Sequence, residues 1–208
     1  MGRLFITGIT TLILLISLIL IGITVASVIL GDAVGTTTEE DYDQLLEETI
    51  DEISTYLLIK DQKGKYYDIS GEQRIEKIAL WITPLVSQEI DISQLTIQLY
   101  NGETVRILTY NGNAEYLESN LLFEHSIWSN ITGDNFGFIS IIDLDGSLVG
   151  YNAINEDSDN AYVLIRLPED MTLAKRESII VTLFPSTGIT RTTVLKAPLP
   201  IKSVVTFE

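Results

Sequence analysis

The strongest constraint on this chain is a run of 28 residues, from Leu4 to Gly31, that contains no charged side chain. As a helix the run would extend about 42 Å, whereas about 20 residues are enough to cross the apolar core of a bilayer. The run is also longer than the apolar part of a secretory signal peptide, and no small-residue cleavage site follows it. We therefore predict a permanent apolar helix that is kept out of water.

Small and hydroxyl-bearing residues form a stripe along this helix. Thr10, Ser17, Thr24 and Gly31 recur every seven residues, and Gly8 and Gly22 share a second heptad position. Such stripes let helix backbones approach each other closely in an environment without water. The alternative is a lone anchor whose hydroxyl groups bond to carbonyl groups of their own helix. The spacing favours packing against neighbouring helices.

An acidic connector follows the apolar run. The sequence DAVGTTT (32–38) is poor helix material, so we expect an end or a hinge near Gly35. Between Glu39 and Glu52 lie eight acidic residues and no basic one, with apolar residues at helical spacing. This predicts an amphipathic helix whose acidic side is either a solvated face or a cation-bridged collar that regulates packing. We divide the chain into an assembly or membrane helix (1–34), an acidic connector (35–72) and an outer domain (73–208).

The outer domain shows short β-like runs separated by turns. Asn101-Gly102 is a strong hairpin signal, and Asp145-Gly146 and Pro185 to Gly188 mark further turns. The expected strands are 74–84, 95–100, 103–110, 136–143, 161–167, 178–184, 190–195 and 201–207. About eight strands at this spacing indicate an antiparallel sandwich or barrel. The predicted fold class is a long N-terminal α-helix followed by an all-β antiparallel sandwich, similar to an immunoglobulin domain.

Composition excludes several functions. The formal net charge is −16, so nucleic acid is not an expected partner, because phosphate binding needs a basic surface. The chain has no Cys, which excludes disulfides and thiolate chemistry. Its one histidine, His125, lies among aromatic residues and is expected to be structural. No phosphate loop, nucleophile elbow or zinc-protease motif is present, and we expect no enzyme activity and no cofactor.

Two kinds of surface site remain as candidates. Asn130-Ile131-Thr132 is an N-glycosylation sequon, and we expect Asn130 to carry a glycan if the chain is exported. Acidic loops contain Asp143 and Asp145 in DLDGS, and Asp157 and Asp159 in NEDSDNAY. Oxygen donors in such loops can bind a cation such as Ca²⁺, although ordinary Asp and Asn turns explain the pattern better. We keep these four residues as weak metal candidates.

The order of these parts resembles archaellin, the filament subunit of the archaeal motility machine, which is related to type IV pilins. The segment GITTLILLISLILIGITVASVIL (8–30) is similar to the N-terminal helix of that family. The segment 75–103 resembles its first strands, and 179–207, with two Pro stops and a Gly turn, resembles its C-terminal end. The segment from about 110 to 135 resembles no known pattern.

The resemblance implies a structural protein that polymerises with copies of itself for swimming. It implies subunits that wait in the cytoplasmic membrane, interact with motor and platform proteins of the export machine, and end in an extracellular filament. The side chains expected to pack the helix core are Leu12, Leu14, Leu15, Leu18, Ile19 and Ile21. Close helix approach is expected at Gly8, Thr10, Ser17, Gly22 and Thr24. The alternatives are an adhesion pilin of the same superfamily, or a single-pass, envelope-binding component of the stator type.

Overall fold

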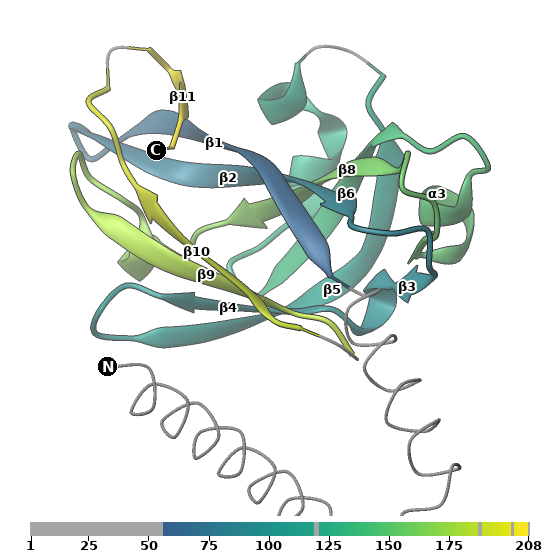
Figure 1. Ribbon diagram of the computed structural model, residues 1–208. Coiled ribbons are helices and arrows are strands. Elements are labelled where there is room, and N and C mark those ends of the chain that lie inside the picture. Colours follow the sequence, from purple (N-terminus) through teal and green to yellow (C-terminus); the bar gives the residue numbers. More distant parts are fainter. Residues whose placement is uncertain (1–55, 119–120, 187–188, 201, 208) are drawn as a thin grey trace, which may run out of the picture. The chain divides into compact units, whose positions relative to one another are not determined.

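A curled β-sheet dominates the part of the chain that the computed structural model describes, which is residues 56–118, 121–186, 189–200 and 202–207 (Figure 1). The predicted apolar helix, its packing residues and the acidic connector up to residue 55 lie outside the described residues. Within the described ranges, no helix is both long enough and apolar enough to cross a bilayer.

Nine strands make up the main sheet, in the order β10-β9-β4-β5-β6-β8-β2-β1-β11. Their bounds are β1 (Leu57–Ile69), β2 (Glu72–Pro84), β4 (Thr96–Tyr100), β5 (Val105–Tyr116), β6 (Asn135–Ile142), β8 (Asn160–Arg166), β9 (Ser178–Phe184), β10 (Arg191–Lys196) and β11 (Val204–Thr206). A second sheet pairs β3 (Ile90–Asp91) with β7 (Ala153–Ile154). The short helical elements are η1 (Ile92–Gln94), η2 (Leu122–Glu124), η3 (Ser126–Asn130), α3 (Ser147–Tyr151) and η4 (Glu169–Met171).

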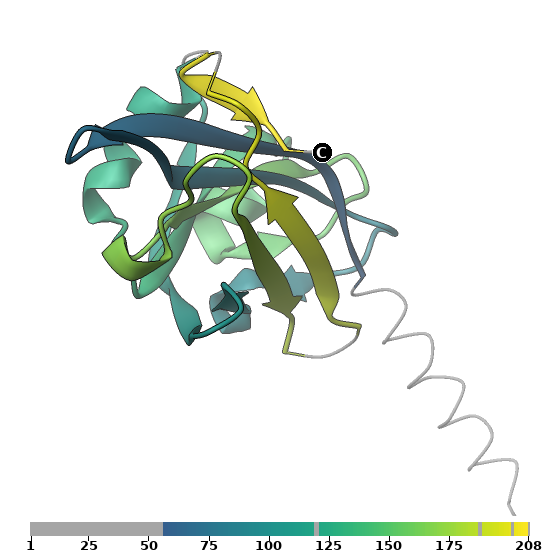
Figure 2. The same ribbon diagram turned by 90° about the vertical axis from the view of Figure 1, so that its left-hand side faces the viewer.

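The main sheet folds over on itself, so that strands distant in its order come together. Figures 1 and 2 show β9 and β10 crossing below β1 and β2. The side chain of Gln62 on β1 donates a hydrogen bond of 2.9 Å to Thr193 Oγ1 on β10. The mostly β character predicted for this region is therefore confirmed, with nine of its strands in one curled sheet.

One pair of strands departs from the predicted antiparallel arrangement. Strands β5 and β6 run parallel, with Thr109 opposite Asn135 and Tyr116 opposite Ser140. A parallel pair cannot be closed by a tight turn, and it requires a crossover connection. The segment 117–134 provides that connection, and it is the stretch in which sequence analysis found no known pattern.

Strand β1 was not among the predicted strands, because a bulge interrupts the alternation of its side chains. Its register with β2 shifts between Ile59 and Asp61, and again between Lys65 and Tyr66. The first shift leaves Lys60 of β1 unpaired, and the second leaves Glu76 of β2 unpaired, so only the first moves the inward side chains of β1 out of the period of two. The apolar signal is thereby spread over polar residues, although Leu57 and Tyr66 are buried.

The interior of the curled sheet is filled by aliphatic side chains and two phenylalanines. The alternating residues Ile97 and Leu99 of β4 point inward and are fully buried, as the sequence pattern predicts. Phe136 and Phe138 on β6 are also fully buried, and the ring of Tyr110 lies 5.5 Å from that of Phe138 in an edge contact. This core holds the inner face of the sheet together.

A second apolar cluster covers the outer face of β2, β6 and β8. The crossover segment contributes Phe123 and Trp128, whose rings stack with centroids 5.9 Å apart. The Trp128 indole N–H donates to the carbonyl oxygen of Leu122 at 2.8 Å, so its polar atom is satisfied. Strand β8 is consequently buried on both faces, with Tyr162 and Leu164 in this outer cluster.

The predicted turns have their expected chemistry. Asn101 Oδ1 accepts hydrogen bonds from the backbone N–H groups of Glu103 and Thr104, and Gly102 adopts φ +101°. Strands β4 and β5 therefore form the expected hairpin. After Asp145, Gly146 adopts φ +74° and leads into the single turn of α3.

Candidate functional site

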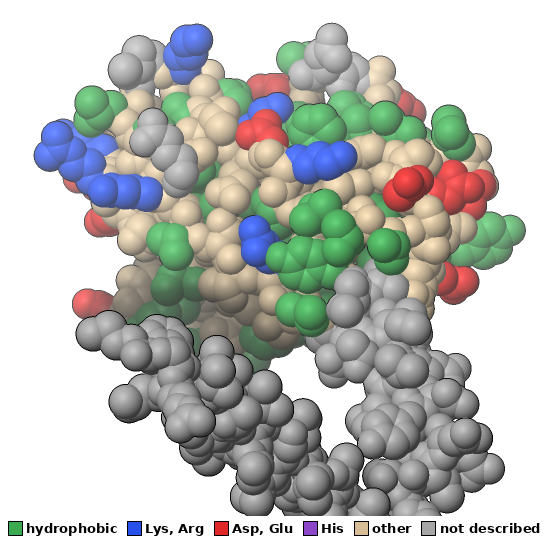
Figure 3. Space-filling model, in the orientation of Figure 1, with side chains coloured by type: hydrophobic (Ala, Val, Ile, Leu, Met, Phe, Trp, Pro, Cys, Tyr) green, Lys and Arg blue, Asp and Glu red, His purple; other side chains and the backbone are tan. Residues whose placement is uncertain are grey.

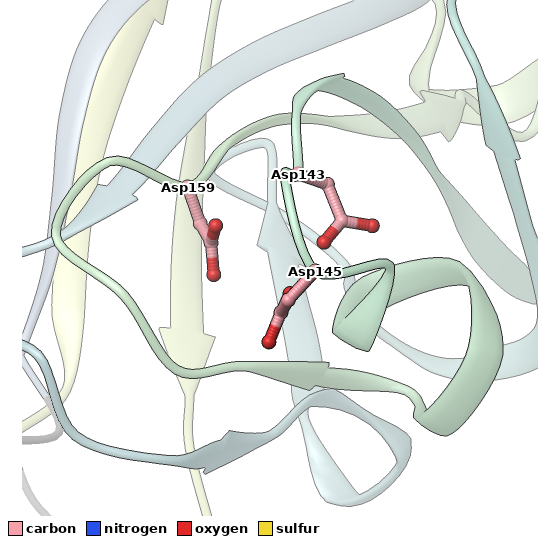
Figure 4. Close-up of side chains that lie close together, drawn as sticks. All are labelled: Asp143, Asp145 and Asp159. Atoms are coloured by element: carbon pink, nitrogen blue, oxygen red, sulfur yellow. The ribbon is translucent and has the colours of Figure 1, made fainter.

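Three aspartates come together at one end of the sheet. Asp143 follows β6, Asp145 precedes α3, and Asp159 ends the loop before β8. One carboxylate oxygen from each lies within 4.8 Å of the others. Figure 4 shows the three side chains next to one another between the two loops. We call Asp143, Asp145 and Asp159 the acidic cluster.

Two buried oxygens of the acidic cluster have no hydrogen-bond donor among the described residues. Asp159 is only 2% exposed, and its Oδ2 accepts the backbone N–H groups of Asn155 and Glu156, each at 3.0 Å. Its Oδ1 is buried without a partner, and so is Oδ1 of Asp143. A buried acceptor without a donor costs free energy, more so when it is charged. This arrangement favours a cation as the missing partner.

The environment shifts the pKa values of two cluster carboxyls in opposite directions. The amide of Asn155 donates to Asp145 at 2.8 Å, which, with the backbone N–H of Ser147, lowers the Asp145 pKa to about 2. Burial raises the pKa of Asp143, and the neighbouring Asp145 raises it further. Asp145 therefore stays ionised, while ionisation of Asp143 is disfavoured when nothing compensates its charge.

The donor set of the acidic cluster fits a hard divalent cation. Carboxylate oxygens are the preferred ligands of Ca²⁺ and Mg²⁺. Of the four aspartates singled out from the sequence, the structure groups three. Asp157 lies outside the cluster, and its backbone N–H donates to Ser87 Oγ at 3.1 Å. Sequence reasoning did not identify Asn155, which orients Asp145 and follows β7 directly; its only signal was its position in an Asp- and Asn-rich loop.

The other two sequence candidates lie on the crossover segment. Asn130 is exposed at the end of η3, as a modified asparagine must be. The ring of His125 is held by the backbone on both sides: Nδ1 accepts the N–H of Ile127 at 3.3 Å, and Nε2 lies 3.2 Å from the carbonyl oxygen of Tyr116. These contacts show the structural role expected for His125.

Comparison with known proteins identifies the family. The sequence profile of the archaeal-type flagellins matches residues 6–195.

The chain belongs to the archaeal-type flagellin family.

Individual flagellins support this assignment. Flagellin B3 of Methanocaldococcus jannaschii is 30% identical over 146 residues, which are 68% of this chain and 65% of that protein, slightly less than two thirds of its length. Flagellin B5 of Pyrococcus abyssi is 28% identical over 155 residues, covering 70% of this chain and 69% of its own length.

Two solved structures share the fold. The crystal structure of archaeal flagellin FlaB1 from M. jannaschii aligns with a TM-score of 0.64 and 23% identity, covering 73% of this chain and 95% of that one. A subunit of the archaeal flagellum of Methanospirillum hungatei strain JF1 aligns with a TM-score of 0.53 and 12% identity, covering 97% and 99%.

The resemblance to archaellins noted in the sequence is thereby confirmed. This flagellin is a structural subunit of the archaellum filament, and its family is not one of enzymes. Flagellins of this family form the archaellum filament, an appendage of the outer cell surface.

Proposed function

We propose that copies of this flagellin polymerise through their N-terminal apolar helices into the filament that propels a swimming cell. The observation that carries the proposal is the extent of the family match, residues 6–195, which includes most of the apolar run and most of the β domain. Before assembly, the uncharged run (4–31) anchors the subunit in the cytoplasmic membrane, where motor and platform proteins of the export machine receive it.

The helix residues provide most of the driving force in this proposal. A helix that is apolar on all sides suits both lipid and a helical bundle. Burying about 25 apolar side chains at about 1.5–3 kcal/mol each corresponds to tens of kcal/mol per subunit as an upper bound. The leucines and isoleucines from Leu12 to Ile21 pack the core of the bundle, and the stripe of small residues from Gly8 to Thr24 allows the helices to approach closely. Contacts that do not close into a ring produce an open helical filament.

Substitution of Leu15 tests the bundle. Leu15→Asp places an unpaired charge among dry helices and should abolish filaments seen by electron microscopy of material sheared from cells. Leu15→Ile keeps the volume and is the matched control, which should assemble normally. Normal filaments from Leu15→Asp would refute the proposal. A swimming assay on a deletion strain separates this function from static adhesion, because an adhesin is not needed for swimming.

We propose further that the acidic cluster binds a divalent cation, with Ca²⁺ as the first candidate. The support is the pair of buried, unpartnered oxygens of Asp143 and Asp159 beside the ionised Asp145. Equilibrium dialysis of the full chain in detergent with radioactive Ca²⁺ measures binding directly. Asp159→Asn should lose it, whereas Asp157→Asn, outside the cluster, should keep it. Equal binding by both variants would contradict the assignment.

We also propose that Asn130 carries a glycan. The asparagine is exposed, and so is Thr132 of its sequon. Mass spectrometry of peptides from native filaments should find an added mass on Asn130 that disappears in Asn130→Gln. An unmodified peptide from native filaments would refute the proposal.

A further inference from the structure

The outward side of β4, β5, β9 and β10 carries a patch without charges. The strand registers place Val105, Tyr100, Ile180 and Val194 side by side in one row across the four strands. The next outward row runs from Ile107 on β5 to Thr192 on β10 and passes only through neutral residues. We call the outward residues of these two rows the neutral face.

The neutral face exposes apolar side chains to solvent. Val105, Ile107 and Val194 are 54%, 62% and 53% exposed. Figure 3 shows mostly hydrophobic and uncharged atoms over the middle of this view, with Lys and Arg side chains at its left-hand end and a few more near its centre and top. The first row connects Val105 and Val194 through the partly exposed Tyr100 and Ile180, so it forms an apolar strip across the four strands.

The composition of the chain indicates what such a face contacts. Each copy carries a formal charge of −16, so copies repel one another on average. Close packing of two charged surfaces also removes water from carboxylates, which is costly unless each is paired. Two copies avoid both costs where the packed surface carries no charge. The neutral face meets this condition.

The size of the face indicates how strong the contact is. Four strands about 4.8 Å apart and two rows about 7 Å apart give roughly 250 Å². A stable interface between free proteins buries about 800 Å² on each partner. The face alone is therefore too small to make a dimer in solution. It suits a contact that forms when another element already holds the copies together and raises their effective concentration.

We propose that the neutral face is where the β domain of one subunit packs against a neighbouring copy in the filament. The inference rests on the proposed function, in which the apolar helices hold the copies together. It adds a second, independent contact on the outer domain that determines which assembled arrangement is stable.

Charge insertion at Ile107 tests the contact. Ile107→Glu and Ile107→Lys should each reduce filament mass per cell by about tenfold or more, because either charge must be desolvated on packing. The thermal unfolding of the detergent-solubilised chain should stay unchanged, since the side chain is largely exposed. Leu121→Glu, at a site 59% exposed on the crossover segment, is the matched control and should assemble normally.

The outcomes separate contact from general repulsion. Normal filaments from both Ile107 variants would overturn the proposal. Loss of filaments in Ile107→Glu but not in Ile107→Lys would also overturn the proposal, because that pattern indicates long-range repulsion between acidic copies. A wild-type chain that forms no filament would instead refute the proposed function, and the basis of this inference with it.

Cross-linking identifies the occupant of the face. Val194→Cys, in a chain without other cysteines, can be labelled with a benzophenone in filaments grown from an equal mixture of ¹⁴N and ¹⁵N subunits. Cross-linked peptides that combine both isotopes are expected if a second copy occupies the face. Cross-links only within one chain, to residues 1–55, would overturn the proposal and assign the face to the subunit's own N-terminal segment.

Discussion

Calcium should stabilise the β domain through the acidic cluster. A ligand that binds only the folded chain adds RT ln(1 + [L]/Kd) to the free energy of unfolding. Calcium sites of extracellular modules have Kd values of about 10⁻⁴–10⁻³ M. At about 10 mM Ca²⁺ the gain is then about 1.4–2.7 kcal/mol. For a chain of this size, we expect Tm to rise by about 3–10 °C.

The assay is thermal unfolding of the full chain in detergent, followed by near-ultraviolet circular dichroism. Trp81 and Trp128 both belong to the described domain, so the signal reports its packing. The comparison is between chelator and Ca²⁺, with NaCl matched for ionic strength so that general screening is held constant.

Asp143→Asn provides a two-sided test. The pKa of Asp143 is raised in the folded chain, chiefly by burial, so the folded state favours the protonated form. That preference stabilises the fold below the unfolded-state pKa and is lost as pH rises through the folded-state pKa. At neutral pH the ionised group therefore lowers stability when no cation is bound. Asp143→Asn should raise the Tm in chelator and abolish the Ca²⁺-dependent rise.

Several results would refute this reasoning. If the wild-type Tm is the same in Ca²⁺ and in chelator, Ca²⁺ does not stabilise the folded chain. A full Ca²⁺ response in Asp143→Asn excludes this carboxylate as a ligand. Loss of the response in Asp157→Asn, which lies outside the cluster, would show that the response comes from elsewhere.

Three further predictions concern the fold and the filament. In Gly64→Ala, the new Cβ would lie 2.8 Å from Phe207 Cζ, so urea unfolding should show a free energy of unfolding that is lower by about 1–3 kcal/mol. Adding Phe207→Leu should restore part of this loss, and unchanged stability in Gly64→Ala would contradict the packing. Burial raises the pKa of Tyr67 and Tyr110 to about 12, so their contribution to stability persists below pH about 10 and is lost as pH rises toward 12. Titration at 295 nm should show at least two tyrosines that ionise late, and ionisation of every tyrosine near pH 10 in folded protein would refute this. Filaments of an acidic subunit should weaken at low ionic strength, and equal stability by light scattering from about 10 mM to 1 M NaCl would count against mutual repulsion.

Local patterns predicted the individual strands well. Strands β4, β6, β9 and β10 lie within one or two residues of the predicted runs, because each alternates or forms a short apolar block between turn residues. The Asn101-Gly102 hairpin was predicted for the same reason, since its turn chemistry is contained in adjacent residues. Where structure depends on neighbours along the chain, sequence reasoning succeeds.

Long-range relations limited the prediction elsewhere. The parallel pairing of β5 and β6 depends on the strand order of the whole sheet, which no local pattern encodes. The crossover segment has an irregular sequence because its side chains fit one particular outer surface rather than a periodic element. The acidic cluster joins Asp145 to Asp159, and only the fold shows that Asp159 belongs and Asp157 does not.

The two-sided burial of β8 has a consequence for how a subunit matures. Its sequence NAYVLIR has high β-propensity and one charged residue, a composition prone to aggregation when it is exposed. Its partner strand β6 is close along the chain, but its other partner, β2, is distant, so a long loop must close before β2 pairs with β8 and this step of folding should be slow. Until the crossover segment docks, the outer face of β8 stays open to other nascent subunits. The period between synthesis and docking is therefore when this protein is most exposed to misassembly, and a variant whose crossover segment docks slowly should be detected first as aggregate in the cell.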